Sequence, residues 1–375
     1  MDRVFKISLE NTLTYEIKRV TNIFDENNPA LGNHIKTHKA YCLIDRKLIN
    51  EYLAAKAYFS RNGIEAYHFL IDASEKSKDL QTVIDFTSFC FKNGIGRRDS
   101  IIAIGGGIVC DLAGMSANLI RRGTPCIKIP TTLLGIIDAS VGVKNGINYA
   151  GCKNSLGTFY LPDVVFIDLD FLDTLPLCEI KNGLIEMIKI ISLKDNDSWH
   201  LLKRNIHNFL LKKIDADVIE LIDRSIYFML EELRDNLFEE NLYRVVDYGH
   251  EFGHLIEVLT NFEISHGEAV GIGMRLSNNL AYVQGLMDKS HYEDFVSVLD
   301  SLNMPSWHSA LTCQQLFDKK EVVTKHKGGN FSIVALRKIG DPFFLSDFSF
   351  SEFEYACNDL VAKDELALSK ASTHY

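Results

Sequence analysis

The first half of the chain alternates short apolar runs with segments of helical periodicity. The run DSIIAIGGG at 99–107 is continuously apolar until its glycines, as expected of a strand buried on both faces. Helical patterns follow two of the runs, in NEYLAAKAYFSRNG and near residues 78–93. Strands separated by helices indicate βαβ units and a doubly wound parallel sheet. The other predicted strands are AYCLID at 40–45, EAYHFLI at 65–71, PCIKIP at 125–130 and VVFIDL at 164–169.

Long helical patterns dominate the chain after about residue 177. We therefore predict an α/β plus α fold, with a Rossmann-like doubly wound domain over 1–177 and an all-helical domain over 178–375. A site between the two halves would lie at the carboxyl ends of the strands. The predicted helices include EIKNGLIEMIKII at 179–191, ADVIELIDRSIYFMLEEL at 216–233, RVVDYGHEFGHLIEVLT at 244–260 and GEAVGIGMRLSNNLAYVQGL at 267–286.

Composition narrows the class of protein without naming a function. The chain has 375 residues, 46% hydrophobic and 24% charged, which is typical of a globular protein with a sizeable core. A net charge of -10 argues against nucleic-acid binding. The opening MDRVFKISLE does not resemble a signal peptide, and glycines interrupt the longest apolar stretch, so we expect no membrane span. Eight cysteines without a CxxC indicate reduced thiols and a cytoplasmic location.

Gly105 to Gly107 stand directly between a predicted strand and a predicted helix. Glycines at such a turn let backbone amides approach a pyrophosphate, and the helix N-terminus favours the anion. Because Cys110 replaces the last glycine of GxGxxG, a simple tight turn remains an alternative. Asp45 ends an early strand, where an acid can bind a ribose. Glu75 and Lys78 share one turn at a helix start, where a solvated surface pair is the alternative.

The polar run PTTLLGIIDASVGVKNGINYAGCKN at 130–154 combines glycines, lysines and side-chain amides. Such a loop can hold a substrate that carries a phosphate. An ordered surface loop with incidental lysines is the alternative. The polar side chains of the run are Asp138, Lys144, Asn148, Lys153 and Asn154.

The stretch YGHEFGHLIE at 248–257 places His250 and His254 four residues apart. Residues at this spacing share one face of a helix. His266 follows at the expected start of the next helix, and Glu186 with Lys189 lies on one turn of an earlier helix. Two histidines and a carboxylate from three helices are a common zinc-binding set with one open coordination position. Structural histidines are the alternative.

Eight motifs in order resemble the sugar phosphate cyclases, the superfamily of 3-dehydroquinate synthase. The resemblance runs from about Asp45 to at least His266. It implies a dehydroquinate synthase-like fold, NAD and a divalent metal, either zinc or cobalt. The motifs are GGGIVCDLAG, RRG, PTTLLGIIDASVGVKNGIN, KN, FLDTLP, GLIEMIK, DYGHEFGH and SHGEA.

The resemblance also implies roles for individual residues. Arg122 matches an arginine that reaches a neighbouring subunit's phosphate site, which implies a homodimer. His254 is implied as an acid–base group at the substrate or its phosphate. The implied metal ligands are Glu186, His250 and His266. The implied NAD contacts are Asp45, Glu75, Lys78, Gly106, Gly107, Asp111, Thr131, Thr132, Lys153, Phe171 and Thr174. The implied substrate contacts are Asp138, Lys144, Asn154, Lys189 and Arg244.

Two departures from the family pattern concern the substrate. Met229 stands where dehydroquinate synthases carry a lysine that pairs with the substrate carboxylate, and methionine cannot neutralise a buried carboxylate. Asp247 replaces the asparagine three residues before the metal histidine, and it can accept a hydrogen bond from a hydroxyl. Both favour a neutral polyhydroxy sugar phosphate. The run FMLEELRDNLFEENLYRVVDYGH is similar to cyclases that use sedoheptulose 7-phosphate.

The implied reaction converts sedoheptulose 7-phosphate to a C7-cyclitol with release of phosphate. It proceeds through transient oxidation by NAD, β-elimination, reduction and an intramolecular aldol step. The implied product is 2-epi-5-epi-valiolone or an epimer such as 2-epi-valiolone. The epimer stays open because cyclases that use sedoheptulose 7-phosphate usually read GHTFSP, without a second histidine, whereas this chain keeps GHEFGH with His254. The alternatives are 3-dehydroquinate synthase, 2-deoxy-scyllo-inosose synthase, a related alcohol dehydrogenase and a binding protein without catalysis.

Overall fold

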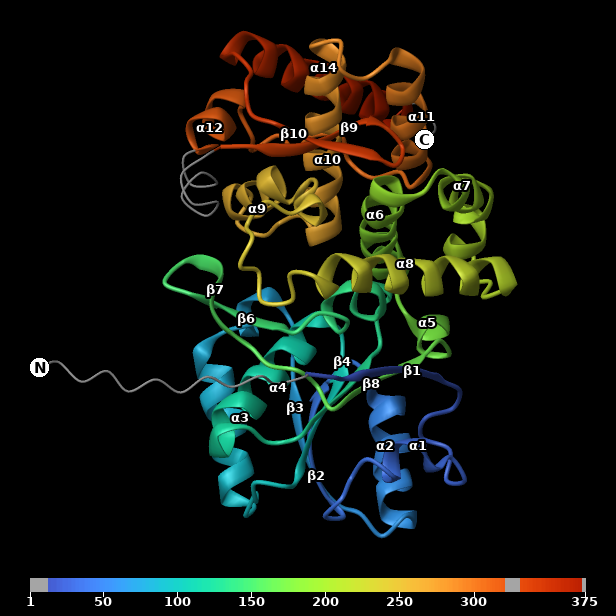
Figure 1. Ribbon diagram of the computed structural model, residues 1–375, viewed down its shortest axis with the longest axis vertical. Helices are drawn as coiled ribbons and strands as arrows, with labels where there is room; N and C mark the ends of the chain where they lie inside the picture. The colour runs from blue at the N-terminus through green and yellow to red at the C-terminus, as the bar shows by residue number, and fades with distance from the viewer. Residues whose placement is uncertain (1–12, 321–330, 373–375) are drawn as a thin grey trace, which may run out of the picture.

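A six-stranded parallel sheet forms the N-terminal half of the molecule (Figure 1). The structure is a computed structural model that describes residues 13–320 and 331–372, so the opening MDRVFKISLE lies outside it. All five predicted strands are present, and an additional strand, β1, lies at one edge. The order is β1 (Glu16–Val20), β8 (Val164–Asp168), β5 (Cys126–Pro130), β4 (Ser100–Gly105), β2 (Lys39–Asp45) and β3 (Glu65–Ile71).

Helices cover both faces of this sheet, which explains why its central strands are apolar throughout (Figure 1). Alternate side chains of β2 point to opposite faces. Tyr41 and Leu43 lie in a core shared with α3 and α4, whereas Ile44 lies in a second core shared with α2. The helices of this half are α1 (Pro29–Gly32), α2 (Ile49–Arg61), α3 (Leu80–Lys92) and α4 (Gly107–Leu119).

The direction of strand addition reverses beside β2. The next strand, β3, pairs with one edge of β2, and the chain then crosses to the other edge, where β4 pairs. Parallel sheets bind ligands in the crevice outside the carboxyl ends of the strands at such a switch point. Here those ends are Asp45 on β2 and Gly105 on β4, so the predicted glycine turn lies at the switch point.

The polar run at 130–154 is not the loop that the sequence predicts. It forms a short helix followed by a hairpin. Residues Gly135–Ala139 form a single π-helical turn, and β6 (Lys144–Tyr149) pairs antiparallel with β7 (Cys152–Phe159). Ala150 and Gly151 connect the strands with φ of 51° and 75°, as a tight hairpin turn requires. The hairpin was not predicted, because the polar residues and glycines of these two strands interrupt the apolar pattern by which strands are recognised.

The C-terminal half is largely helical, but the prediction that it is all helical is wrong. Strands β9 (Ile333–Lys338) and β10 (Asp341–Leu345) form an antiparallel hairpin. The amide of Leu336 donates to Asn278 on the neighbouring α10, so helix side chains satisfy a buried strand edge. The helices are α5 (Phe171–Thr174), α6 (Leu177–Lys194), α7 (Asn196–Leu210), α8 (Ala216–Arg234), α9 (His250–Leu259), α10 (His266–Val283), α11 (Lys289–Ser301), α12 (Cys313–Asp318) and α14 (Phe350–Ser372).

The helix predicted over 244–260 begins only at His250. A 3-10 turn, η4 (Val245–Asp247), precedes it, and Gly249 is the N-cap residue with a left-handed φ of 78°. A Cβ atom at Gly249 would lie 2.5 Å from Cγ of Met274 and 2.7 Å from the carbonyl oxygen of Val270 on α10. This glycine therefore allows α9 and α10 to approach closely and sets the direction in which His250 leaves the backbone.

One hydrophobic core joins the two halves. It includes Leu133 and Val165 from the sheet half and continues through Leu184, Ile188 and the other buried side chains of α6. The division into domains at residue 177 stays a prediction, since the packing is continuous across it. None of the helices in the described parts of the chain is long and apolar enough to cross a membrane.

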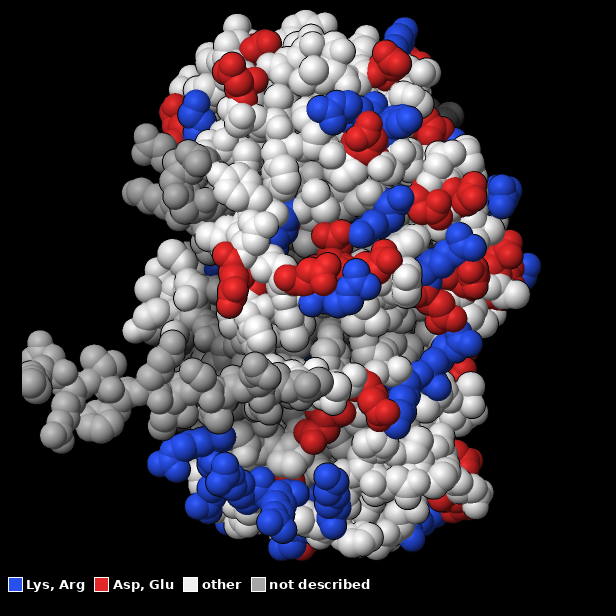
Figure 2. Space-filling view, viewed as in Figure 1, with Lys and Arg blue, Asp and Glu red and all other residues white. Residues whose placement is uncertain are grey.

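Charged side chains of both signs are interspersed over the middle of the face in Figure 2. Ion pairs at the surface of the described residues include Arg224 with Glu220 at 2.7 Å and Lys203 with Asp294. Pairs exposed to this degree contribute little to stability, at most about 1 kcal/mol each. Stability therefore comes mainly from the buried cores.

We expect Gly249→Ala to lower the free energy of unfolding by about 2–5 kcal/mol, from left-handed strain and overpacking against α10. Gly285 also has a positive φ, of 70°, but nothing lies within 4 Å of an added Cβ, so Gly285→Ala is the matched control. That control should cost only about 1–2 kcal/mol. Urea denaturation of both variants measures the difference, and equal losses would contradict the close approach of the helices.

Candidate active site

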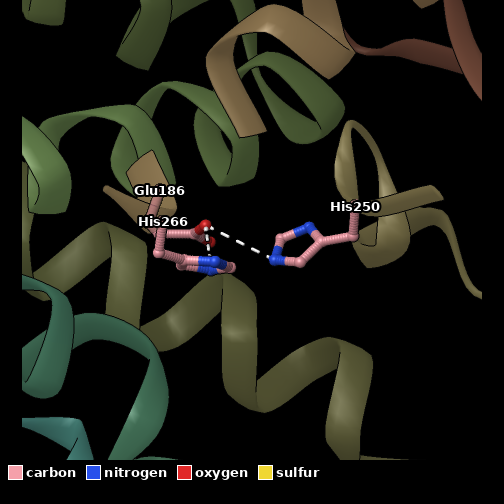
Figure 3. A group of neighbouring side chains, drawn as sticks. All are labelled: Glu186, His250 and His266. Atoms are coloured by element: carbon pink, nitrogen blue, oxygen red, sulfur yellow. Dashed lines mark ion pairs between the residues drawn. The ribbon is translucent and has the colours of Figure 1, made fainter. Parts of the chain in front are cut away.

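Glu186, His250 and His266 converge from three helices (Figure 3). Glu186 lies in the middle of α6, while His250 and His266 are the first residues of α9 and α10. One carboxylate oxygen of Glu186 lies 3.5 Å from Nε2 of each histidine, and all three candidate ligand atoms lie within 4.8 Å of one another. The tertiary structure thus brings together the three residues of the predicted metal set.

Glu186 is completely buried, and neither of its carboxylate oxygens accepts a hydrogen bond of normal geometry from the described residues. Burial by itself raises the pKa of such a group, but Lys189 and then His250 and His266 hold the pKa of Glu186 well below its usual range. The Lys189 ammonium lies 2.5 Å from the second oxygen. A buried, ionised carboxylate beside two histidine nitrogens fits a divalent cation, and zinc in particular accepts these ligands.

Residues 250–254, HEFGH, also fit the HExxH pattern of metalloproteases, in which both histidines bind the metal. The geometry does not support that chemistry here. His250 joins Glu186 and His266, whereas Glu251 is buried and accepts a hydrogen bond from the backbone amide of Val334. Glu251 therefore serves the packing of α9 against β9 and is not positioned as a general base.

The glycine turn leads from β4 into α4, as the sequence predicts. Gly106 is the N-cap residue, and an added Cβ there would lie 3.0 Å from the side chain of Thr132. At Gly107 it would lie 2.9 Å from Cβ of Ala139. Side chains are thus excluded at the amino end of a 13-residue helix, where exposed backbone amides can bind a phosphate group.

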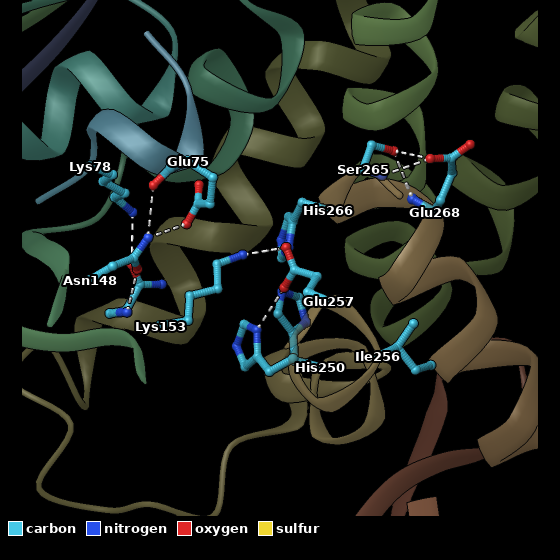
Figure 4. Close-up of polar contacts among 12 residues, drawn as sticks. Glu75, Lys78, Asn148, Lys153, His250, Ile256, Glu257, Ser265, His266 and Glu268 are labelled. Carbon is cyan, nitrogen blue, oxygen red and sulfur yellow. Dashed lines mark hydrogen bonds and ion pairs between the residues drawn. The ribbon is translucent and has the colours of Figure 1, made fainter. Parts of the chain in front are cut away.

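Around this turn, several of the expected NAD contacts form one polar network centred on the buried Lys78 (Figure 4). Nζ of Lys78 lies 2.7 Å from Asp111 on α4 and 2.8 Å from the side-chain oxygen of Asn154 on β7. Burial acts to lower the pKa of Lys78, but Asp111 and Glu75 hold it above its usual value. Asn148 of β6 donates to the Glu75 carboxylate at 3.0 Å. Lys78 is therefore a fixed internal cation and not a solvated surface residue.

The other expected NAD contacts lie at the same carboxyl edge of the sheet. Thr131 and Thr132 follow β5, and the Thr132 hydroxyl accepts a hydrogen bond from the amide of Gly135. Phe171 and Thr174 lie on α5 after β8, where Phe171 is buried in the core shared with α2. Asp45 ends β2 and accepts a hydrogen bond from the amide of Lys47. The tertiary structure thus places them along the same edge of the sheet as the glycine turn.

Lys189 connects the predicted metal site, formed by Glu186, His250 and His266, to a second carboxylate. Its ammonium lies 3.3 Å from Asp138 on the π-helical turn and also forms an ion pair with Glu186. Burial raises the pKa of Asp138 against the opposing effect of Lys189, so this carboxyl group holds a proton more readily than an exposed aspartate. A buried lysine between two carboxylates, one of them readily protonated, can position a substrate and exchange a proton with it.

Lys144 and Arg244 meet at a residue that we did not predict. Glu239, in the segment after α8, lies 2.8 Å from Nζ of Lys144 and also pairs with Arg244. Arg244 pairs in addition with Asp247 at 2.5 Å. Lys144 from the N-terminal hairpin and Arg244 from the C-terminal half, both expected to contact the substrate, therefore lie close together. Nothing in the spacing of FEENLYR marked Glu239, because its role depends on contact with β6.

His254 lies beside the predicted metal site but belongs to a different group of contacts. Its ring centre is 5.2 Å from that of His250, and its Nδ1 lies 3.2 Å from Glu257, one turn further along α9. Glu257 was not predicted either. A signal was available, since Glu257 follows His250 by seven residues and His254 by three, which places all of them on one helix face.

Arg122 is not near this site within one chain. It lies exposed just beyond the carboxyl end of α4, whereas the glycine turn is at the amino end. A helix of 13 residues separates the two ends by about 20 Å. The backbone around Arg122 is unusual, since Arg121 and Arg122 have φ of 55° and 62°. If Arg122 contacts a substrate, the substrate is bound by another subunit.

Comparison with known proteins identifies the family. Residues 68–182 match the family 3-dehydroquinate synthase N-terminal, and residues 183–325 match 3-dehydroquinate synthase C-terminal. A 2-epi-5-epi-valiolone synthase of Actinomyces sp. is 34% identical over 374 residues, which are 96% of this chain and 98% of that one. A 3-dehydroquinate synthase of Corynebacterium efficiens is 37% identical over 280 residues, 74% of this chain and 77% of that one.

Among solved structures, a 2-epi-5-epi-valiolone synthase from Streptomyces hygroscopicus subsp. jinggangensis with NAD+ and Zn2+ bound matches with a TM-score of 0.91. It is 32% identical, and the match covers 96% of this chain and 100% of that chain. The chain therefore belongs to the 3-dehydroquinate synthase family of sugar phosphate cyclases. Within the family it is similar over nearly its whole length to 2-epi-5-epi-valiolone synthases, and the predicted fold class is confirmed apart from the hairpin β9–β10.

If Glu186 is a metal ligand, Glu186→Gln should abolish the stabilisation of the protein by zinc. Saturation of the unchanged protein at 100 times the dissociation constant should add about 2.7 kcal/mol to the free energy of unfolding. Glu179→Gln, at a half-buried position on the first turn of α6 and outside the predicted metal set, is the control and should keep the full effect. Thermal unfolding with and without zinc measures both. A zinc-dependent shift retained by Glu186→Gln would exclude this residue as a ligand.

Proposed function

We propose that this protein is a sugar phosphate cyclase that converts sedoheptulose 7-phosphate to 2-epi-5-epi-valiolone, or to an epimer such as 2-epi-valiolone, with release of phosphate. The match over nearly the whole length of 2-epi-5-epi-valiolone synthases supports the reaction class. The choice of a neutral sugar over a carboxylated substrate rests on one observation, the environment of Met229.

Met229 is 4% exposed and packs in a small apolar cluster with Val141 and Ile190. Ile190 follows Lys189 directly, and Val141 lies three residues after Asp138, so the cluster adjoins the expected substrate groups. A substrate carboxylate directed here would be buried without a cation, at a cost of several kcal/mol. A sugar phosphate without a carboxylate avoids that cost.

Asp247 supports the same choice from the other side of the site. It pairs with Arg244, so the arginine is partly neutralised and offers less attraction to a second anion. A carboxylate at this position can accept hydrogen bonds from the hydroxyl groups of a sugar, and such charged hydrogen bonds are worth about 1.5–3 kcal/mol each. An acid beside the substrate therefore favours hydroxyls over a carboxylate.

The proposed cofactors are NAD, bound at the carboxyl edge of the sheet, and a divalent metal held by Glu186, His250 and His266. When bound, NAD supplies reversible acceptance of a hydride, so that it is regenerated within the reaction. When bound, the metal supplies a positive charge that makes a coordinated hydroxyl more acidic. The amino end of α4 would receive the pyrophosphate, with Gly106 and Gly107 allowing its approach.

The side chains of the chain itself would bind the sugar and move protons. Lys189 and Asp138, held 3.3 Å apart, would orient hydroxyl groups beside the metal position and exchange a proton with them. Lys144 would hold the anionic end of the substrate, where a phosphate group can replace Glu239 as its partner. Arg244, which is already paired with Asp247, would donate hydrogen bonds to hydroxyl groups of the sugar. His254, with Asn154 on the opposite half, would face the leaving phosphate.

A second candidate is 3-dehydroquinate synthase. It is favoured by the retained second histidine, His254, and by the 37% identity to the Corynebacterium efficiens protein. It is disfavoured by Met229 and Asp247, which leave a substrate carboxylate without a partner.

We also propose a homodimer in which Arg122 of each subunit completes the site of the other. The exposed position of Arg122, beyond the carboxyl end of α4, supports a role between subunits. Arginine binds phosphate with two parallel hydrogen bonds, which suits a contact made only on assembly.

The substrate assignment is tested by phosphate release in the presence of NAD and zinc or cobalt. The sugar sedoheptulose 7-phosphate and the carboxylated substrate of 3-dehydroquinate synthase should be compared in parallel. Release should occur from the sugar, without net accumulation of NADH at 340 nm, and NMR of the product then assigns the epimer. Release from the carboxylated substrate alone would identify a divergent 3-dehydroquinate synthase, and net NADH formation would indicate a dehydrogenase.

The contribution of Arg122 between subunits is tested by mixing two inactive variants. Arg122→Ala lacks the donated arginine, and Glu186→Gln lacks a metal ligand, so each homodimer should be inactive. A heterodimer purified through two different tags has one intact site of two and should recover roughly half of the activity of the unchanged protein. Heterodimers as inactive as both parents would mean that Arg122 does not act across the interface.

A further inference from the structure

The buried carboxylate of Glu257 is the centre of a second cluster of polar side chains, adjacent to the predicted metal site (Figure 4). Its side chain is 3% exposed. One oxygen lies 3.2 Å from Nδ1 of His266 and also contacts Nζ of Lys153, while the other lies 3.2 Å from Nδ1 of His254. Two histidines and a lysine therefore direct polar groups at a single carboxylate.

The two ring nitrogens of His266 face different carboxylates. Nε2 lies 3.5 Å from Glu186, and Nδ1 lies 3.2 Å from Glu257. A carboxylate at Nδ1 favours the tautomer that carries its proton on that nitrogen, which leaves the lone pair of Nε2 available to a cation. His254 also directs Nδ1 to Glu257, so the same residue fixes the orientation of both rings.

From this geometry we infer that Glu257 is a positioning residue that orients His266 for metal binding and His254 for contact with the substrate. The inference rests on the proposed function, which assigns a divalent metal to Glu186, His250 and His266. Glu257 does not touch that metal position itself. It acts by fixing the tautomer and direction of the histidine ring that does.

The same side chains could instead be taken for a second metal site, since His254, Glu257 and His266 also bring ligand atoms within 4.8 Å of one another. The position of Lys153 argues against this. Its ammonium contacts Glu257 and lies 3.3 Å from Nδ1 of His266, so a positive charge from the protein already lies among these groups. A second metal ion would compete with this ammonium for the same carboxylate oxygen and ring nitrogen. The first position differs, because Lys189 pairs with Oε2 of Glu186 and leaves Oε1 to the two histidines.

Lys153 also explains why this carboxylate can remain charged while buried. Burial acts to raise the pKa of Glu257, but His266, His254 and Lys153 together hold it far below its usual range. Lys153 comes from β7 of the N-terminal half, whereas Glu257 lies on α9, so the pair also connects the hairpin to the metal-binding helix. Glu257 thus positions the histidines relative to the half of the molecule expected to bind NAD.

The test compares Glu257→Gln with the unchanged full-length protein in zinc and cobalt binding. Glutamine has the same shape, but only one of its two end atoms can accept a hydrogen bond, so it cannot satisfy both histidines and Lys153. We expect the zinc dissociation constant, measured by competition with a chromophoric chelator, to rise about 10–100-fold. The visible absorption spectrum of the cobalt-loaded variant should change as His266 is reoriented. Glu263→Gln, at a side chain 70% exposed, is the matched control and should change neither quantity.

An unchanged zinc dissociation constant and cobalt spectrum in folded Glu257→Gln would overturn the inference. Should that variant not fold, Glu257→Asp replaces it, because it keeps the charge but shortens the reach to the rings, and an unchanged zinc affinity there has the same meaning. Failure of the unchanged protein to bind zinc would instead contradict the proposed function. The two failures are therefore distinguishable without any assay of the reaction.

Discussion

The structure depends on keeping one carboxylate ionised in the interior of the protein. Glu186 is fully buried in the middle of α6, and nearly every residue of this helix from Ile180 to Leu193 is buried as well. An unpaired charge there would cost several kcal/mol, even after relaxation of its surroundings. Lys189 on the next turn offsets part of that cost, and the two histidines supply polar neighbours. The same arrangement that makes the charge tolerable creates a position suited to a cation.

Close approach of three helices makes this convergence possible. α9 and α10 cross where Gly249 meets Gly273, and a Cβ at Gly273 would lie 2.1 Å from the Gly249 carbonyl oxygen. Because both histidines are the first residues of their helices, the crossing determines how their rings face α6. Larger side chains at the crossing would separate the helices and with them the ligand atoms.

The active site is also a junction between the two halves. Glu257 on α9 holds Lys153 of the hairpin, and Glu239 holds Lys144 of the same hairpin. These contacts pair cations of the N-terminal half with carboxylates of the C-terminal half. The pair of Lys153 with Glu257 is buried, so separation of its partners would leave an uncompensated buried charge. A change in the relative position of the halves would therefore alter nucleotide, metal and substrate contacts together.

Much of the site was predictable because the relevant patterns are local. Apolar runs between helical segments predicted the sheet, and the glycines at 105–107 predicted the turn at its switch point. The spacing of His250 and His254 correctly placed them on one helix face, and the motif order identified the family. The start of α9 was misplaced, since the left-handed residue Gly249 is required by contact with α10 and not by its own neighbours in sequence.

By itself, the sequence determined the family, the fold class and the types of side chain available at the site, because each of these depends on patterns among residues close together in the chain. Only the tertiary structure decided which of them act together. Glu257 shares a helix face with the histidines in the sequence, but only contact with β7 reveals its pairing with Lys153. Nothing in the sequence marks Glu239, whose pairing with Lys144 depends on contact with β6. The hairpin of β9 and β10 is stabilised by helix side chains distant in sequence. Burial and distance decide whether a charge is solvated or must be paired, and both depend on contacts between residues far apart in the chain.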